Sequence, residues 1–204
     1  MFSIISMNDL ASIQKASSLL HPVSDLPGVM TLGRLRGRLT EVSTDTSGGS
    51  LSALVPVLLE VQEKGHMIGW VEAGPTVFFP PDLSFRGVDT AAVVVAMIRP
   101  NDALLASDWL CRSGAFGLVV VDNPPAVVEE SALGRLAKLA QAHDTAIVLL
   151  TRKKPEAPSL GSLVSLRIAV ERQPGQVAAT ILRDRRYHSH NRQRWDLNGP
   201  HILF

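Results

Sequence analysis

The sequence predicts an α/β domain in which helices cover both faces of a largely parallel sheet. Apolar runs alternate with amphipathic helical patterns four times along the chain, as in successive strand–helix–strand units. The runs are continuously aliphatic, which is typical of strands buried on both faces of a parallel sheet. The C-terminal part changes to two strand-like segments joined by a turn. The expected fold is a three-layer α/β/α sandwich with a C-terminal antiparallel hairpin and an N-terminal helix appendage.

The individual elements follow from the spacing of apolar residues. Strands are expected at 39–42, 67–73, 92–98, 117–122 and 145–151, and the hairpin at 163–170 and 177–183. Helices are expected from the turn at 47–50 through Val61, and at 101–113 and 129–142. Pro56 lies inside the first of these helices, so we expect it to kink that helix or to delay its start.

The chain has 204 residues, which suits one domain whose core is large enough to need no disulfide. We expect a core domain at 35–204, preceded by a helix and linker at 1–34 that form a candidate partner-docking segment. Helical spacing is approximated by Leu10, Ile13, Leu19 and Leu20, and it is interrupted by Pro22, Pro27 and Gly28.

Composition excludes several classes of protein. With 46% hydrophobic and 19% charged residues the chain is not disordered, and its net charge of +1 argues against a uniformly basic nucleic-acid coat. The single cysteine, Cys111, forms no intramolecular disulfide, and no CxxC metal spacing is present. The start lacks the features of a signal peptide, and no run of about 18 apolar residues would span a membrane. We expect a cytoplasmic or nucleoid-associated protein without a metal or other cofactor.

The first strand-to-helix junction is where a nucleotide hydrolase would carry its phosphate loop, GxxxxGK[ST]. In that motif backbone amides surround the phosphates, the lysine neutralises them and the hydroxyl holds magnesium. Here the segment 44–51 reads TDTSGGSL, so Ser50 replaces the lysine, Leu51 replaces the hydroxyl residue, and Asp45 adds negative charge. The sequence therefore predicts a degenerate nucleotide site without hydrolysis, at Thr44, Ser47, Gly48, Gly49, Ser50 and Asp122.

Two acidic residues follow expected strands near this degenerate site. Asp122 ends the run LVVV, where hydrolases place a magnesium-binding aspartate, but such a residue more often serves the turn after a strand. Glu72 ends an earlier strand and is a candidate water-activating base. Without a phosphate loop, however, that base would have no substrate.

Other reactive residues are weaker candidates. His188 and His190 form an HxH pair without a third ligand nearby, which favours a solvated loop over a metal site. Cys111 lies on an expected helix, so we expect an inert, partly buried thiol. Trp70 and Trp109 lie in apolar patterns and are expected in the core.

The best positive signal is the basic segment RDRRYHSHNRQR at 183–194, whose single acid is Asp184. On the tip of a hairpin, its arginines would concentrate positive charge for phosphates or for an acidic protein surface, and a solvated loop is an equal alternative. The candidate DNA- or partner-binding residues are Arg183, Arg185, Arg186, Arg192 and Arg194. A second basic element, GRLRGR at 33–38, is expected to be an entry loop to the core.

Several strings resemble the RecA-like family, and within it the ImuA proteins of bacterial mutagenesis cassettes, which are grouped with the cell-division inhibitor SulA. The resemblance extends from about Leu35 to Arg172. It is carried, in order, by LRGRLTEV (35–42), RGVD (86–89), IRP (98–100), SGAFGLVVVD (113–122), LAKLAQAHDTAIVLL (136–150) and GSLVSLRIAVER (161–172).

The resemblance also reveals departures from the recombinases. Gly74 stands where recombinases carry a catalytic glutamate, and Thr151 stands where they carry a nucleotide-sensing glutamine. Their long DNA-binding loop corresponds here to the short segment RKKPEAPSL at 152–160. These departures imply the loss of ATP hydrolysis, strand exchange and autonomous filament formation.

By resemblance, the chain is expected to be a non-catalytic accessory protein of SOS-induced translesion mutagenesis. Its implied partners are RecA, ImuB and the error-prone polymerase, with single-stranded DNA as a further candidate ligand and no membrane. The N-terminal helix is a candidate mimic of the segment by which RecA protomers contact their neighbours. Two alternatives stay open: a SulA-like inhibitor that binds FtsZ, and a weakly DNA-binding or residual ATPase protein.

Overall fold

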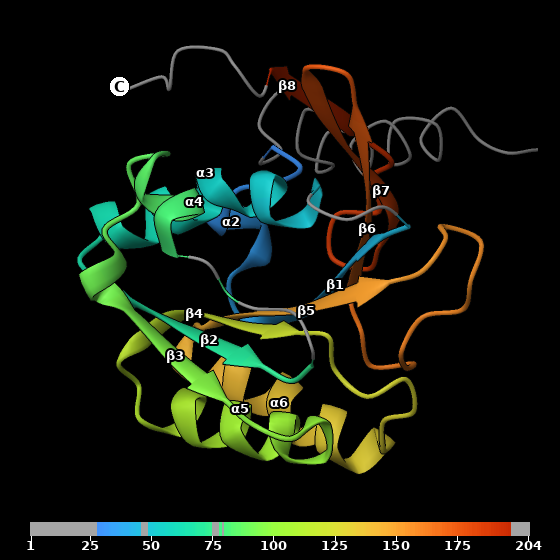
Figure 1. The fold of residues 1–204 in the computed structure, drawn as a ribbon. Helices are drawn as coiled ribbons and strands as arrows, with labels where there is room; N and C mark the ends of the chain where they lie inside the picture. Colours follow the sequence, from blue (N-terminus) through green and yellow to red (C-terminus); the bar gives the residue numbers. More distant parts are fainter. Residues whose placement is uncertain (1–27, 46–48, 75–77, 79, 197–204) are drawn as a thin grey trace, which may run out of the picture.

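The computed structural model describes residues 28–45, 49–74, 78 and 80–196, and it confirms the predicted α/β class (Figure 1). Within these residues one eight-stranded sheet has the order β3-β2-β4-β5-β1-β6-β7-β8. The parallel strands are β1 (Arg38–Thr44), β2 (Met67–Glu72), β3 (Val93–Met97), β4 (Phe116–Asp122), β5 (Ala146–Arg152) and β6 (Leu166–Gln173). The antiparallel additions are β7 (Gln176–Asp184), which pairs with β6, and β8 (Arg192–Asp196), which pairs with β7.

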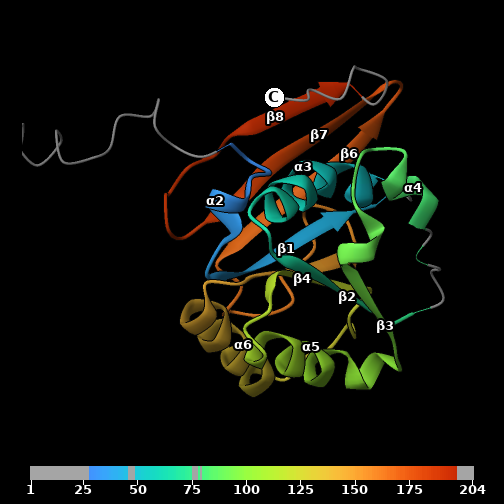
Figure 2. The ribbon, with the colours of Figure 1, turned by 90° about the vertical axis from the view of Figure 1, so that its left-hand side faces the viewer.

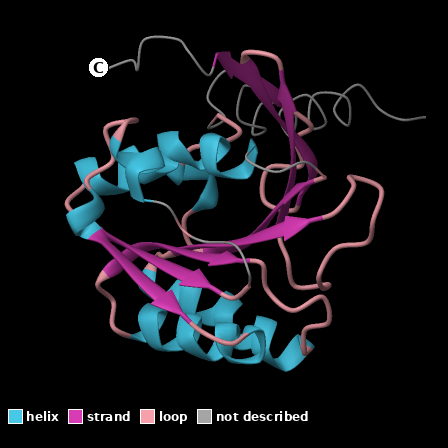
Figure 3. Ribbon diagram, viewed as in Figure 1, coloured by secondary structure: helices cyan, strands magenta, loops and turns pink. Residues whose placement is uncertain are grey.

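Helices lie on both faces of the sheet, which gives the expected three layers (Figures 1 and 2). One face carries α2 (Leu32–Leu35), α3 (Gly49–Glu63) and α4 (Pro80–Ser84), and the other carries α5 (Ala103–Arg112) and α6 (Glu130–His143). Two short 3-10 turns, η2 (Thr90–Ala92) and η3 (Pro100–Asp102), flank β3. Strands β6–β8 bend away from the other strands of the sheet toward the side of α3 (Figure 3).

The continuous apolar runs supply two cores because successive side chains of a strand point to opposite faces. In β4, Val120 packs in the cluster that includes Leu58 of α3, whereas Val119 packs in the cluster that includes Leu136 of α6. The predicted burial on both faces is therefore confirmed for the central strands. No helix among the described residues is long and apolar enough to cross a bilayer.

Two apolar features differ from the expectation. The run 92–98 forms β3 but is not covered on both faces, because β3 is an edge strand that pairs only with β2 among the described strands. Val94 and Val95 are each 37% exposed, and Met97 is 72% exposed. Trp70 is buried as predicted, but Trp109 is 66% exposed because it lies on the side of α5 away from the buried Cys111.

Pro56 does not delay the helix that contains it. Helix α3 begins at Gly49 and continues through Pro56 to Glu63, so the expectation of a later start is wrong. The neighbouring Leu54 and Leu58 are fully buried. Burial of this apolar stripe outweighs the hydrogen bond that a proline cannot donate.

The C-terminal part of the core contains the predicted hairpin and one strand that was not predicted. The hairpin has Pro174 and Gly175 in its turn, and the additional strand is β8, which was not expected because RQRWD has no apolar alternation. Residues 28–34 pack against the core, with Met30 and Leu32 fully buried. The expected N-terminal helix, with Leu10, Ile13, Leu19 and Leu20, lies outside the described residues.

Candidate functional site

The carboxyl ends of β1, β2, β4 and β5 meet at one edge of the sheet, where open α/β folds bind their ligands. Thr44 ends β1 and is buried, and Asp122 ends β4 directly beside Glu72, the last residue of β2. Gly49 opens α3, and Ser50 follows it half-buried. The other two predicted residues, Ser47 and Gly48, lie outside the described part of the chain.

Negative charge collects at this edge. The pKa of Asp122 lies above its ordinary value, mainly because the residue is buried. The charge of Arg152 opposes this shift, and the charge of Glu72 adds to it. Glu72 is 3% exposed, and its Oε2 accepts a hydrogen bond of 2.9 Å from the backbone N–H of Phe78. Within the described residues, no three His, Cys, Asp or Glu side chains gather closely enough to hold a metal ion. Glu72 and Asp122 therefore place two carboxylates side by side at this edge, with the charge of Arg152 close enough to act on Asp122.

Gly74 stands where the family resemblance places a catalytic glutamate. A Cβ atom at Gly74 would lie 2.2 Å from Nδ2 of Asn123, which is closer than any real contact. Asn123 follows Asp122 with a left-handed φ of 58°, a conformation that asparagine tolerates better than most residues. A side chain at position 74 would therefore require the Asn123 side chain to move.

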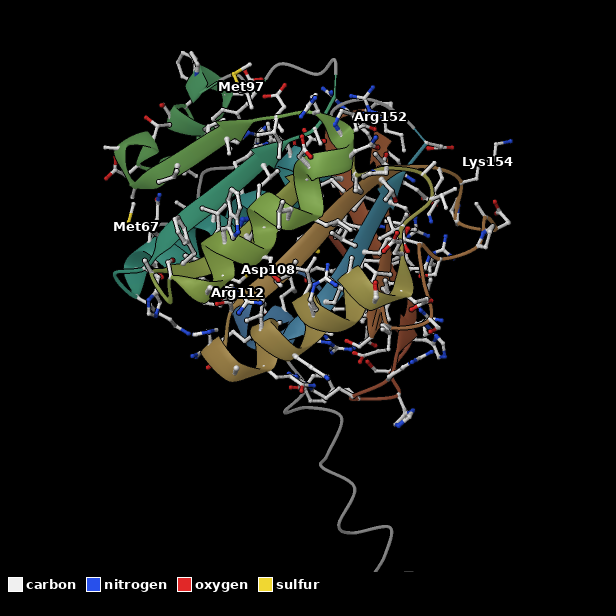
Figure 4. All side chains as sticks on the ribbon, turned by 90° about the horizontal axis from the view of Figure 1, so that it is seen from below. Met67, Met97, Asp108, Arg112, Arg152 and Lys154 are labelled. Atoms are coloured by element: carbon white, nitrogen blue, oxygen red, sulfur yellow. The ribbon has the colours of Figure 1, made fainter. Side chains whose placement is uncertain are left out.

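The start of α3 packs against β6 rather than standing open. A Cβ at Gly49 would meet Cγ1 of Val170 at 3.2 Å and Cβ of Arg172 at 3.6 Å. Beside it, a groove of about 550 Å³ separates Thr44 and Asp45 from the loop after β5 and from the β6–β7 hairpin. Its cations are Lys154 and Arg172, and its acids are Asp45, Glu156 and Glu171. Arg152 and Lys154 both lie at the carboxyl end of β5 (Figure 4).

The loop after β5 is fixed to the sheet by Glu41, a buried residue in the middle of β1. Its Oε1 pairs with Lys153 and accepts from Thr151 Oγ1 at 3.1 Å, and its Oε2 accepts from Ser159 Oγ at 2.8 Å and from Leu160 N at 3.1 Å. Burial raises the pKa of Glu41. Lys153 and the hydrogen bonds from Leu160 and Ser159 lower it by more, so the net pKa lies below its ordinary value. An acid inside the strand pattern LTEV was the available signal, and sequence reasoning missed it.

The arginines of the C-terminal segment do not form a single patch. Arg183 is half-buried and donates through Nη2 to Val164 O at 2.8 Å, while Arg186 donates through Nη1 to Arg36 O at 3.0 Å. Arg192 pairs with Glu171 at 2.8 Å. Within the described part of the chain, the side chains of Arg185 and Arg194 have no hydrogen bond or ion pair, and both are exposed. Arg185 and Arg194 are therefore the arginines of this segment whose side chains are least engaged by the described fold.

Asp184 joins the two basic segments that the sequence presented separately. Its Oδ2 accepts from Arg34 Nη1 at 2.5 Å and its Oδ1 accepts from Arg38 Nη2 at 2.9 Å, and all three side chains are almost fully buried. Backbone N–H groups of Arg186 and Tyr187 also donate to Oδ1, and Arg34 lies over the ring of Tyr187 at 5.1 Å. The segment 33–38 is thus a buried structural element rather than a solvated entry loop.

Replacing both Arg185 and Arg194 with alanine is expected to change the unfolding free energy by less than about 0.5 kcal/mol, because exposed charges contribute little to stability. If the basic segment binds single-stranded DNA, the salt dependence of log K is expected to weaken by about 0.7 per arginine. Fluorescence anisotropy with a labelled oligonucleotide over a salt series measures this. Arg192→Ala, which removes an arginine paired with Glu171, is the matched control. Unchanged affinity and slope would remove these two residues from any DNA-binding role.

Comparison with known proteins agrees with this topology. No protein-family model matches the chain. It is 29% identical over 133 residues to the RecA protein of Chlorobium limicola, 33% identical over 102 residues to that of Chlorobium chlorochromatii, and 32% identical over 95 residues to that of a Nocardioides species. These alignments cover 64%, 50% and 46% of this chain, but only 38%, 29% and 27% of the respective RecA chains. The similarity and the fold together support a RecA-like superfamily protein.

Proposed function

We propose that this chain is a non-catalytic, RecA-like accessory protein of SOS-induced translesion mutagenesis, which acts by binding protein partners through its surface. The carboxyl edge of the sheet carries the proposal. It brings together the ends of β1, β2, β4 and β5 in a chain that is similar to RecA proteins, while position 50 holds serine in place of the phosphate-binding lysine.

Three features of that edge support the absence of catalysis. Asp45, Glu72 and Asp122 add negative charge where a triphosphate would have to bind, and the loop 44–51 has no basic side chain to offset it. Position 74 is glycine and so offers no water-activating base, and the Asn123 side chain packs against it. The loop after β5 is held against the sheet by Glu41, instead of extending as a DNA-binding loop.

The partners in this proposal come from the resemblance to the ImuA group: RecA, ImuB and the error-prone polymerase. The similarity to RecA chains supports a relation to the recombinase family but identifies no partner. Exposed Arg185 and Arg194 are the residues proposed to contact an acidic partner surface or single-stranded DNA.

Weak nucleotide binding without hydrolysis is the second candidate. The groove beside Thr44 and Asp45 contains the cations Lys154 and Arg172, which come from the loop after β5 and from β6. Two cations from other elements are a chemically adequate substitute for part of a phosphate loop. Direct measurement of Mg-ATP binding distinguishes this candidate from the first.

A pull-down tests the choice of partners. The tagged full-length chain is recovered from mitomycin-treated cells and the eluate is probed for RecA, ImuB and FtsZ. We expect RecA or ImuB to be retained, and retention to fall in the Arg185→Ala/Arg194→Ala variant. Retention of FtsZ alone would favour the division-inhibitor alternative, and retention of none of the three would contradict the proposal.

A further inference from the structure

The two edges of the sheet differ in how they are protected against association. The edge at β8 reads RQRWD, and charged residues at 192, 194 and 196 discourage the addition of another strand. The edge at β3 reads VVVAM, with no charge, no proline and no irregularity in its pairing with β2. An exposed apolar edge strand without such devices is a template for pairing with another strand.

The exposed side chains of this edge lie on both faces of β3. Val94 points to one face and Val95 and Met97 point to the other, and Met67 at the adjoining start of β2 is a further exposed apolar residue. Met97 and Met67 mark the two ends of this edge in Figure 4. A strand that covers β3 would therefore need apolar side chains on both of its own faces.

We propose that two copies of this chain pair their β3 strands antiparallel about a two-fold axis, so that the two sheets join into one. The strand VVVAM itself carries apolar residues on both faces, as the partner strand must. A two-fold pairing is closed and self-complementary, and it leaves only the charged β8 edges at the ends of the joined sheet.

The charges that flank β3 favour the antiparallel orientation. Asp89 precedes the strand and is exposed, and Arg99 follows it with 88% of its side chain exposed. Antiparallel pairing brings Asp89 of one copy to the end of the interface where Arg99 of the other copy lies. Parallel pairing would instead place like charges together, which is unfavourable. Arg99 also contacts Asp102 at 3.0 Å within its own chain, and its high exposure keeps it accessible to a second carboxylate.

The interface is small, because β3 has five residues. We therefore expect a dissociation constant in the micromolar range, as for interfaces at the low end of the usual size. This inference does not depend on the proposed mutagenesis function, since a dimer is compatible with either candidate.

Cysteine cross-linking tests the two-fold geometry. Val94→Cys and Val95→Cys, singly and combined, place thiols close to the axis, where residues on paired strands come within about 4.5–5.5 Å between Cβ atoms. The native Cys111 is buried, which raises its pKa to about 12, so it does not compete. Val127→Cys, at a site 90% exposed and outside β3, is the control. Under mild oxidation we expect a disulfide-linked dimer from at least one β3 variant and only monomer from Val127→Cys.

Sedimentation of the full-length chain tests whether β3 drives association. We expect a dimer at tens of micromolar, a monomer for Val95→Lys with an unchanged melting temperature, and a dimer for Val127→Lys. A wild-type monomer at about 100 µM, or a dimer that Val95→Lys leaves intact, would overturn the proposal. The proposal would also be overturned if Val127→Cys cross-linked as well as the β3 variants. It would be overturned too if no β3 cysteine formed a cross-link because another segment covers β3.

Discussion

Replacing Asp184 with asparagine is expected to lower the free energy of unfolding by about 3–5 kcal/mol. The substitution leaves Arg34 and Arg38 buried without their shared counter-charge, and breaking one side of a buried ion pair costs about that much. For a chain of this size the melting temperature should fall by roughly 10 °C. Chemical denaturation followed by circular dichroism measures the effect.

The matched control is Asp144→Asn. Asp144 also pairs with an arginine, Arg36, but the two side chains are 58% and 39% exposed, so the pair contributes little. Asparagine also tolerates the left-handed φ of 52° at this position. Equal stability losses in the two variants would contradict the central role assigned to Asp184.

The pH dependence of stability follows from the same ion pairs. Burial raises the pKa of Asp184, but the hydrogen bond and charge of Arg38 and two backbone amides lower it more, so the net pKa lies below its ordinary value. A carboxyl group with a lowered pKa stabilises the fold above its unfolded pKa of about 4, and this contribution is lost as the pH falls through the folded value. The stability of Asp184→Asn should therefore vary less with pH below about 4 than that of the wild type.

Replacing Glu41 with glutamine is expected to release the loop after β5 and to cost about 3 kcal/mol. Glu41 accepts hydrogen bonds from Ser159 and Leu160 and pairs with Lys153, so losing its charge leaves buried donors poorly satisfied. We expect faster trypsin cleavage after Arg152 or Lys153, since Lys154 precedes Pro155 and is not a trypsin site, and faster amide exchange at Leu160.

Glu171→Gln is the control for Glu41→Gln. Glu171 pairs with Arg192 at the surface, with 47% of its side chain exposed, and its loss should change neither the melting temperature nor the cleavage pattern. If Glu41→Gln were cleaved no faster than the control, Glu41 would not be what holds the loop.

The periodicity of the sequence was sufficient to predict most of the fold. Continuous aliphatic runs identified the central strands, and Pro174 with Gly175 identified the hairpin turn, because both signals are local. Burial of β3 was predicted wrongly, since a strand's place at the edge of a sheet depends on pairing order rather than on composition. Burial of Trp109 was also predicted wrongly, because it lies on the side of α5 away from the buried Cys111. β8 was missed because an edge strand with charged residues resembles a loop.

The candidate site was predicted less completely. Asp122 ends its strand as predicted, and Thr44 ends β1 although the strand was expected to stop at residue 42. Ser47 and Gly48 lie outside the described residues. The structural roles of Glu41 and Asp184 depend on contacts across more than 100 residues of sequence, which no local pattern reveals. Arg183 and Arg186 likewise donate to distant or non-adjacent backbone carbonyls, whereas the exposed side chains of Arg185 and Arg194 make no such contact within the described residues.

Calorimetric titration of the purified full-length chain with ATP and magnesium tests the proposed surface-binding role most directly. We expect no saturable heat of binding at ATP concentrations up to about 1 mM, which is near the upper end of the usual range of enzyme KM values. Saturable binding in the micromolar range, lost when Lys154 and Arg172 are replaced with alanine, would instead establish a working nucleotide site in the groove and contradict the account.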